Sequence, residues 1–376
     1  MPWKVVPVSD LRLAFVHHVR SLHTPVAQAC RQFGISRKTG HKWLGRAQEG
    51  STQPLLDRSR RPHHSPGRTA EALEQAVLEV RDQFGWGPRK IRAYLNRHGL
   101  VLPSVRTLAA ILHRHGRSGP KPPAAAPLQS FERAEPNQLW QCDFKGPLEV
   151  AKQRVHPFTI LDDHSRYLLA LRPCLDLTMA TAWSILWELF GSVGLPECLL
   201  CDNAFGSRYH APGLSWFEAQ LLRLGIRTTH GRPAHPQTQG KIERLHGTLE
   251  RELWPRVRCD LLEHFQADLE QWRSTVYNLL RPHEALDDLP PVTRWRPSPR
   301  PRPATLPPLD YPPGSVLRKV SDGGSICWQH CYLQVGKGLA GDYIRLEEHD
   351  GWLVLFYAQH PFRRLPTSAL KRRALV

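Results

Sequence analysis

The sequence predicts a multidomain chain in which small all-α units precede an α/β core and a small C-terminal β-barrel. Three observations lead to this prediction. The chain has 376 residues, and length alone predicts two or three domains. Residues 1–136 hold 22 Lys and Arg against 9 Asp and Glu, a balance of +13, which leaves +4 of the total +17 for residues 137–376. Helical, mixed and β-rich patterns then follow one another along the chain.

The uneven charge indicates a nucleic-acid partner, because a basic segment beside a nearly neutral remainder is typical of proteins that bind phosphates. A merely soluble basic protein is the alternative. No apolar stretch reaches the roughly 18 residues that a membrane helix needs, and the best one, 183–195, is interrupted by Glu188. No apolar signal-peptide core follows Met1. We therefore expect a cytoplasmic protein with no membrane association and with reduced cysteines.

Residues 1–52 are typical of a helix-turn-helix unit. A short helix over 26–33 is followed by a turn at 34–36, where Ser36 is a good N-cap for the next helix, 37–46. The second helix has the pattern of a DNA-recognition helix, and its outward residues are Arg37, Lys38, His41 and Lys42. A basic, solvated helix in a small bundle is the alternative.

Residues 53–68 are rich in proline and arginine and have no apolar period. This pattern favours an extended arm in which Arg58, Arg60 and Arg61 follow a phosphate backbone or a minor groove. A plain linker is the equal alternative.

Residues 69–116 predict a second helix-turn-helix unit. Helices are expected over 71–84, 89–97 and, after the cap Ser104, up to His115. Arg106 and Arg114 on the last helix are candidate DNA contacts. The proline- and alanine-rich segment 117–136 then predicts a semi-rigid linker and the clearest domain boundary.

Residues 137–287 predict an α/β core. Strands are expected near 138–144, 156–161, 167–171, 197–201 and 226–229, and helices near 179–193, 215–224, 240–254 and 261–280. Three strands followed by alternating helices and strands are the order of a ribonuclease-H-like fold. The proline-dense segment 288–314 predicts a second linker. Alternating apolar runs separated by glycine turns in 315–376 predict the small β-barrel.

Three acidic residues carry the predicted chemistry. Asp143 and Asp202 each end a short apolar run, as carboxylates at strand ends do, and Glu243 lies at the start of a helical pattern. If they converge, they form an oxygen-only site for hard divalent cations. A paired-metal site of this kind promotes phosphoryl transfer, because the attacking and leaving oxygens both develop negative charge.

Two further patterns, a basic helical stripe and two groups of cysteines, concern DNA and metal binding. Lys241, Arg244, Thr248 and Arg251 fall on one helical stripe that borders Glu243, and we expect them to hold DNA phosphates; a salt-bridged helix face is the alternative. The pair Cys198/Cys201 and the group Cys327, His330 and Cys331 suggest zinc. A zinc site is disfavoured because no second ligand pair stands at a suitable distance.

Five motifs in this order resemble the retroviral-integrase superfamily, and most closely its bacterial insertion-sequence transposases. They are Trp140-Gln-Cys-Asp143, Leu161-Asp-Asp-His-Ser-Arg166, Cys201-Asp-Asn203, His235-Pro-Gln-Thr-Gln-Gly-Lys-Ile-Glu-Arg244 and Tyr277-Asn-Leu-Leu-Arg-Pro-His283. The resemblance implies an integrase catalytic core over 137–287 with Asp143, Asp202 and Glu243 as its catalytic, metal-binding triad. It also implies that Asp162 and Asp163 form a mainly structural turn outside that triad.

The implied activity is that of a transposase of the Asp-Asp-Glu type, with two Mg²⁺ ions and Mn²⁺ as a substitute. The implied partners are double-stranded DNA, as terminal inverted repeats and as target, and further copies of the chain on that DNA, in association with the bacterial nucleoid. Ala204 stands where relatives usually have glycine, and 207–215 lengthens the interval between Asp202 and Glu243. A regulator with an idle core and a nuclease without strand transfer remain the alternatives.

Overall fold

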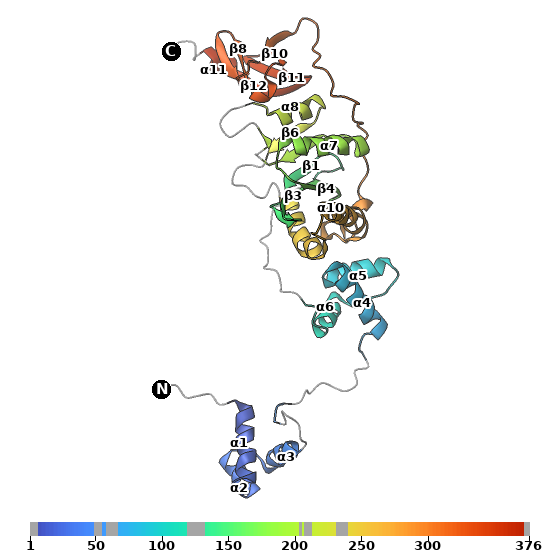
Figure 1. The fold of residues 1–376 in the computed structure, drawn as a ribbon, viewed down its shortest axis with the longest axis vertical. Helices are drawn as coiled ribbons and strands as arrows, with labels where there is room; N and C mark the ends of the chain where they lie inside the picture. Colours follow the sequence, from blue (N-terminus) through green and yellow to red (C-terminus); the bar gives the residue numbers. More distant parts are fainter. Residues whose placement is uncertain are drawn as a thin grey trace. The chain divides into compact units, whose positions relative to one another are not determined.

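The computed structural model describes residues 7–48, 55–57, 67–118, 132–202, 205–206, 213–230 and 240–371 (Figure 1). The chain divides into two compact units, 1–68 and 69–376. The second helical segment therefore belongs to the same unit as the core, and the boundary between units falls at Arg68 rather than in the segment 117–136. None of the described helices combines the length and the apolar character that crossing a membrane requires.

The first unit is a three-helix bundle of α1 (Val8–Arg20), α2 (Val26–Gln32) and α3 (Arg37–Gln48). Ser36 caps α3 as expected, since its Oγ accepts a hydrogen bond from the Thr39 backbone at 3.2 Å. Gly40 allows α3 to pack closely, because a Cβ there would lie 2.5 Å from the Cys30 sulfur and 2.9 Å from the Phe15 ring. The candidate contacts Arg58, Arg60 and Arg61 lie outside the described residues.

The second unit begins with another small bundle, made of α4 (Glu71–Phe84), α5 (Pro88–Arg97) and α6 (Val105–Arg114). Its predicted helices are present almost to the residue. Gly85 ends α4 in the left-handed conformation, with φ of 72°. Ser104 caps α6 by accepting a hydrogen bond from Thr107 N at 3.2 Å.

A mixed sheet forms the centre of the second unit. Its strands are β1 (Trp140–Phe144), β2 (Leu148–Val150), β3 (Gln153–Asp162), β4 (Leu168–Cys174), β5 (Cys198–Cys201) and β6 (Arg227–His230). The order is β2-β3-β1-β5-β6, with β4 also paired to β3, and β1, β5 and β6 run parallel. The expected strand order is therefore present; the sequence prediction lacked only the short strand β2.

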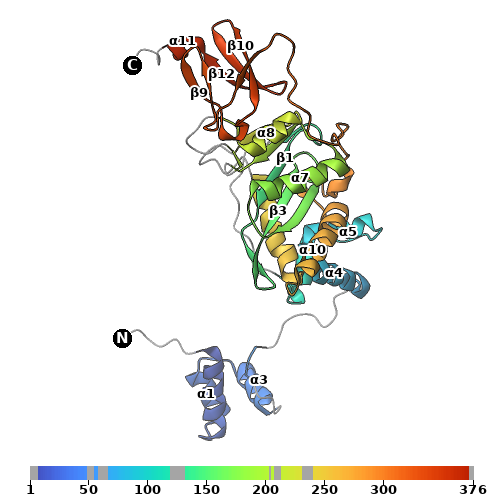
Figure 2. The ribbon, with the colours of Figure 1, turned by 45° about the horizontal axis from the view of Figure 1, so that its top comes forward.

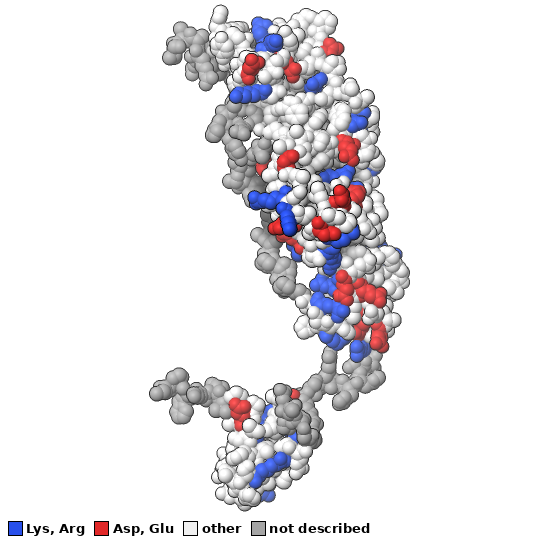
Figure 3. Space-filling view, in the orientation of Figure 1, with Lys and Arg blue, Asp and Glu red and all other residues white. Residues whose placement is uncertain are grey.

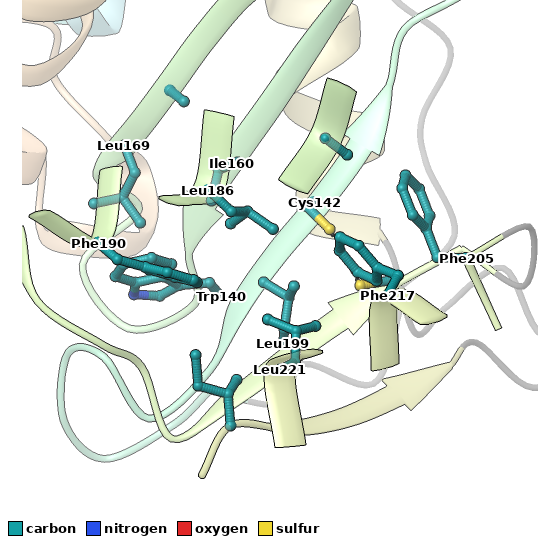
Figure 4. Packing of buried hydrophobic residues seen from close by; sticks show 14 of the residues in the cluster. Trp140, Cys142, Ile160, Leu169, Leu186, Phe190, Leu199, Phe205, Phe217 and Leu221 are labelled. Carbon is teal, nitrogen blue, oxygen red and sulfur yellow. Dashed lines mark hydrogen bonds between the residues drawn. The ribbon is translucent and has the colours of Figure 1, made fainter. Parts of the chain in front are cut away.

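Helices cover both faces of this sheet, in both Figure 1 and Figure 2. On one face, α7 (Met179–Val193) and α8 (Trp216–Arg223) pack on Trp140, Cys142 and Ile160 (Figure 4). On the other, α9 (Gly240–Thr248) and α10 (Leu262–Gln271) pack on Leu161 and Leu168. Alternate residues of β3 thus enter opposite cores, as the period of a strand buried on both faces requires.

The helices of the second face continue with altered winding. π-helical η3 (Leu249–Leu253) and the 3-10 turn η4 (Trp254–Arg256) follow α9, and π-helical η5 (Trp272–Leu280) follows α10. The short turns η6 (Glu284–Leu286) and η7 (Pro291–Thr293) then lead into an irregular strap over 294–315. Arg300 fastens this strap, because its guanidinium donates to the backbone oxygens of Pro196, Leu224 and Gly225.

The expected C-terminal β-barrel is wrong: within the described residues the strands form two open sheets. β7 (Val316–Lys319), β10 (Tyr343–His349), β11 (Trp352–Tyr357) and β12 (His360–Pro366) make one sheet, and β8 (Ser325–Trp328) and β9 (Cys331–Gln334) the other. The turn η8 (Lys337–Leu339) lies between β9 and β10, and α11 (Thr367–Lys371) follows β12. The sheets do not need to close, because Ala219 and Leu222 of α8 join their apolar core. Figures 1 and 2 show α8 between them and the central sheet.

Candidate active site

Two of the three predicted carboxylates follow neighbouring parallel strands. β1 carries Asp143, and Asp202 comes directly after β5. One residue earlier on each strand, the thiols of Cys142 and Cys201 are 3.3 Å apart. The parallel register of the two strands therefore carries Asp143 and Asp202 to the same edge of the sheet.

Asp143 is an acid held in an unfavourable setting for its charge. Its side chain is 24% exposed. Burial and then the charge of Asp202 raise its pKa to about 6; the Phe144 backbone N–H lowers it, and the charge of Glu243 raises it by a smaller amount. The charges of Asp202 and Glu243 thus act on Asp143, and a cation among the three carboxylates would relieve their repulsion.

Glu243 lies in the first turn of α9, is exposed, and approaches Asp143 closely enough to raise its pKa. The three carboxylates are not close enough together to coordinate one ion: among the described residues, no three His, Cys, Asp or Glu side chains are grouped to hold a metal ion. Their chemistry nevertheless fits a hard divalent cation, since all three offer carboxylate oxygen. The Cys198/Cys201 pair lies buried on β5, as expected of a structural strand.

His246 is a site residue that the sequence analysis missed. It lies one turn after Glu243, with Nδ1 3.8 Å from Asp143 Oδ2 and Nε2 2.9 Å from the hydroxyl of Thr159. Burial, and next the charge of Lys145, lower its pKa to about 4, so the ring is neutral at pH 7. The spacing of three from Glu243 on one helix is the signal that could have identified it.

A hollow of about 280 Å³ opens beside Asp143 and Asp202. Its walls include Phe144, Lys145 and Met179. The ammonium of Lys145 is bound to Glu250 at 2.6 Å. The hollow therefore offers carboxylates on one side and apolar surface on the other.

A hydrogen-bonded clamp supports the backbone around Asp202. The ring of His230 lies between the Asp202 carbonyl oxygen, 3.3 Å from Nδ1, and the Glu218 carboxylate, 2.8 Å from Nε2. Both partners only accept hydrogen bonds, and the ring can donate from both nitrogens at once only in its imidazolium form. Its pKa is raised, chiefly by the bond to Glu218. Ser215, which forms a capping box with Glu218, also donates to the Phe205 carbonyl oxygen at 2.7 Å.

Asp162 and Asp163 are engaged in structural contacts. Asp162 accepts from Ser165 N, Ser165 Oγ and Asn137 N at 2.6–2.8 Å. Asp163, wholly buried, accepts from Lys241 Nζ at 2.5 Å. Lys241, expected on the phosphate-binding stripe, thus also anchors the start of α9.

The remaining stripe residues differ in exposure. Arg244 and Arg251 are exposed, as a phosphate-binding role needs. Thr248 is buried and donates to the Arg244 carbonyl oxygen at 3.0 Å, so its expected surface position is wrong. The turn of the helix carries it toward the core, where it meets Arg281.

The candidate DNA contacts on the helix-turn-helix units also differ in exposure. Arg37, Lys38, His41 and Lys42 are all exposed on α3, and Arg106 is exposed on α6. Arg114 instead pairs with the buried carboxylate of Glu74. Its guanidinium is held inside the bundle because Glu74 has almost no access to water.

Comparisons with known proteins agree with this architecture. Integrase core domain families match residues 133–236 and 224–291, a helix-turn-helix domain family matches 11–63, and a homeodomain-like family matches 39–112. The 39.2 kDa protein of insertion element IS476 from Xanthomonas euvesicatoria is 23% identical over 295 residues, which cover 72% of each chain. The chain therefore contains an integrase core domain over residues 133–291, preceded by helix-turn-helix and homeodomain-like domains over 11–112. Homologues with integrase core domains are polynucleotidyl transferases, and helix-turn-helix families are DNA-binding families.

Other similarities are more partial. The protein YlbG of Escherichia coli K12 is 39% identical over 59 residues, which are 16% of this chain and 48% of YlbG. A chain of the simian T-cell lymphotropic virus intasome matches with a TM-score of 0.37 and 18% identity, over 78% of this chain and 96% of that one. The HTLV-2 integrase catalytic core domain in complex with magnesium matches with a TM-score of 0.32 and 17% identity, over 43% and 97% of the two chains.

Proposed function

We propose that this chain is a transposase that binds the terminal inverted repeats of its element, frees their 3′ ends and joins those ends to target DNA. Asp143, Asp202 and Glu243 are the proposed catalytic residues and the ligands of one or two Mg²⁺ ions, for which Mn²⁺ can substitute. The observation that carries the proposal is the meeting of Asp143 and Asp202 at one sheet edge, with Glu243 near enough to raise the pKa of Asp143.

The chemistry follows from this cluster of carboxylates. A divalent cation bound there would offset the negative charge of the attacking and leaving oxygens and lower the pKa of the attacking water. In the first step a water oxygen bonds to phosphorus as the bond to the 3′ oxygen breaks; one proton of the water passes to solvent and the 3′ oxygen becomes a hydroxyl. In the second step that hydroxyl gives up its proton and attacks a target phosphodiester, whose own 3′ oxygen leaves.

The chain's own residues prepare the site. Thr159, next to Asp143 in the sheet register, donates to the Asp143 carbonyl oxygen at 3.0 Å and contacts His246. The His230–Glu218 clamp holds the carbonyl of Asp202. We propose that these contacts fix the backbones of both aspartates while their carboxylates face the DNA.

DNA recognition is proposed for α3 and α6, with the exposed residues Arg37, Lys38, His41, Lys42 and Arg106 as contacts. Arg244 and Arg251 on the exposed side of the catalytic helix are proposed to meet phosphates near the cut. Two DNA ends must be brought together for transposition, so the active form is proposed to be an oligomer assembled on DNA.

Strand transfer tests the proposal directly. Labelled element-end DNA and a plasmid target are incubated with Mg²⁺ and either the native chain, Glu243→Gln or the control Glu263→Gln, an exposed carboxylate on α10. We expect cutting and joining by the native chain and the control, and a loss of at least 100-fold in Glu243→Gln. Specific end binding without any cutting would favour an idle regulator, and Glu243-dependent cutting without joining would favour a nuclease.

A further inference from the structure

A second buried carboxylate, Glu252, gathers donors from three segments of the chain. It lies on η3, nine residues after Glu243 on the same continuous helix, and its side chain is 6% exposed. Arg281 donates to it through Nε at 2.7 Å and Nη2 at 2.9 Å. Lys90 Nζ donates at 2.8 Å and the indole N–H of Trp86 at 3.1 Å.

Glu252 is ionised in this setting. Burial raises its pKa, but the charges and hydrogen bonds of Arg281 and Lys90 outweigh burial and lower the pKa to about 2. A buried carboxylate that loses such partners is strongly destabilised, because its charge is left without compensation. Glu252 and its donors Arg281, Lys90 and Trp86, here called the Glu252 node, therefore hold their segments of the chain together.

Two of the donors come from the α4–α6 bundle and one from the core. Trp86 lies in the turn between α4 and α5, and Lys90 lies on α5. The turn lies against the core at Gly85, where the Cβ position is 2.8 Å from Arg256 Nη2. Glu252 is thus the point at which the bundle is fastened to the catalytic helix.

Further contacts surround the node. Val276 and Leu280 of η5 pack against the bundle's apolar core. Arg97 donates to the Leu280 carbonyl oxygen at 2.8 Å, and Arg89 pairs with Asp288 at 3.0 Å. On the face shown in Figure 3, basic and acidic side chains adjoin one another over the bundle. The contact therefore combines a buried ionic centre with apolar packing around it and a polar rim.

The node also accounts for two sequence features that the proposed chemistry leaves unused. Gly85-Trp-Gly-Pro88 breaks a helix, but it also presents the Trp86 indole to the core. The motif ending in Arg281-Pro-His283 supplies the guanidinium that binds the Glu252 carboxylate.

We infer that Glu252, Lys90 and Trp86 are positioning residues that fix the distance along DNA between the base pairs contacted by the bundle and the phosphodiester that is cut. The inference rests on the proposed function. Glu243 and Glu252 are roughly 13 Å apart along one helix at a rise of about 1.5 Å per residue. The bundle, with Arg106 exposed on α6, is therefore a fixed arm of the catalytic unit, and its DNA contacts have a set spacing from the carboxylates.

The test removes the bundle's donors and leaves the Glu252–Arg281 pair intact. Lys90→Met and the double variant Trp86→Phe/Lys90→Met are compared with the native chain and with Glu79→Gln, an exposed change on α4. Affinity for element-end DNA is measured, and the cut position is mapped at single-nucleotide resolution. We expect DNA affinity within about threefold of native, together with cuts spread over several positions or a loss of at least tenfold at the native position.

The outcomes separate the two proposals. Cutting by the native chain with the same single position and rate in both variants overturns this inference alone. No cutting by the native chain overturns the proposed function, and this inference with it. If the double variant does not fold by circular dichroism, Lys90→Met decides, because the Lys90 side chain is 29% exposed and methionine keeps most of its unbranched chain.

Discussion

Acidic residues of one core serve opposite purposes, and their surroundings decide which. Asp162 and Glu252 are surrounded by hydrogen-bond donors that stabilise their charge. Asp143 is partly buried beside other carboxylates, and both conditions disfavour its charge. The sequence predicted the positions of Asp143, Asp202 and Glu243 because strand ends and a helix start can be recognised locally. It could not identify His230 or Glu252, because their roles depend on partners far away along the chain.

Replacing Asp143 by asparagine is expected to stabilise the metal-free protein at neutral pH. The folded-state pKa is raised from 3.8 to about 6, so this carboxyl makes stability fall as pH rises from about 4 to 6, and the loss persists above 6. Asp143→Asn should therefore raise the unfolding free energy at pH 7.5 by at most about 3 kcal/mol. His246, whose pKa is lowered to about 4, makes both proteins lose stability as the pH falls below 6.5.

Thermal unfolding with EDTA at pH 7.5 and 4.0 measures this effect, and the advantage of Asp143→Asn should shrink at the lower pH. Mg²⁺ should then raise the melting temperature of the native chain more than that of the variant. A variant that is less stable than native at pH 7.5 would contradict the electrostatic account of the site.

At the scale of elements, local signals predicted most helices and strands but not what covers them. The caps at Ser36 and Ser104 are local signals, and each lies where expected. The barrel prediction failed because strand patterns do not reveal that α8 covers the C-terminal sheets. Proline density predicted an irregular segment after residue 288, but not that Arg300 would fasten it to carbonyls of the core.

Arg300→Ala is expected to destabilise the 69–376 unit by about 2 kcal/mol, since hydrogen bonds from a charged donor contribute roughly 1.5–3 kcal/mol. The change leaves three backbone acceptors without this guanidinium. Urea unfolding should show it as a lower midpoint with an unchanged slope. Arg296→Ala is the matched control: that side chain is 69% exposed and its ion pair, with Glu135, lies at the surface, so its effect should stay within about 0.5 kcal/mol.

At the scale of the whole molecule, net charge is divided unequally between the two compact units. Residues 1–68 hold 12 Lys and Arg against 3 Asp and Glu, or +9, which leaves +8 of the total +17 for the 308 residues that follow. The first unit therefore has the higher charge density, and its exposed cations on α3 are available to phosphates. The charge asymmetry and a boundary after Arg68 were visible in the sequence. That α4–α6 and the core form one unit was not, since this depends on contacts such as that between Lys90 and Glu252.

The triple variant Arg37→Ala/Lys38→Ala/Lys42→Ala is expected to weaken binding of the full chain to element-end DNA and to reduce its salt dependence. Each lost phosphate contact should lower the slope of log affinity against log salt by about 0.9. A change of about 2 to 3 in slope would assign all three to phosphates. A smaller change accompanied by loss of preference for element ends over random DNA would assign some of them to bases. Titrations between low and moderate salt measure both quantities. Arg258→Ala, which removes an exposed arginine paired with Asp268, should change neither; equal effects of the two variants would mean that α3 is not the recognition helix.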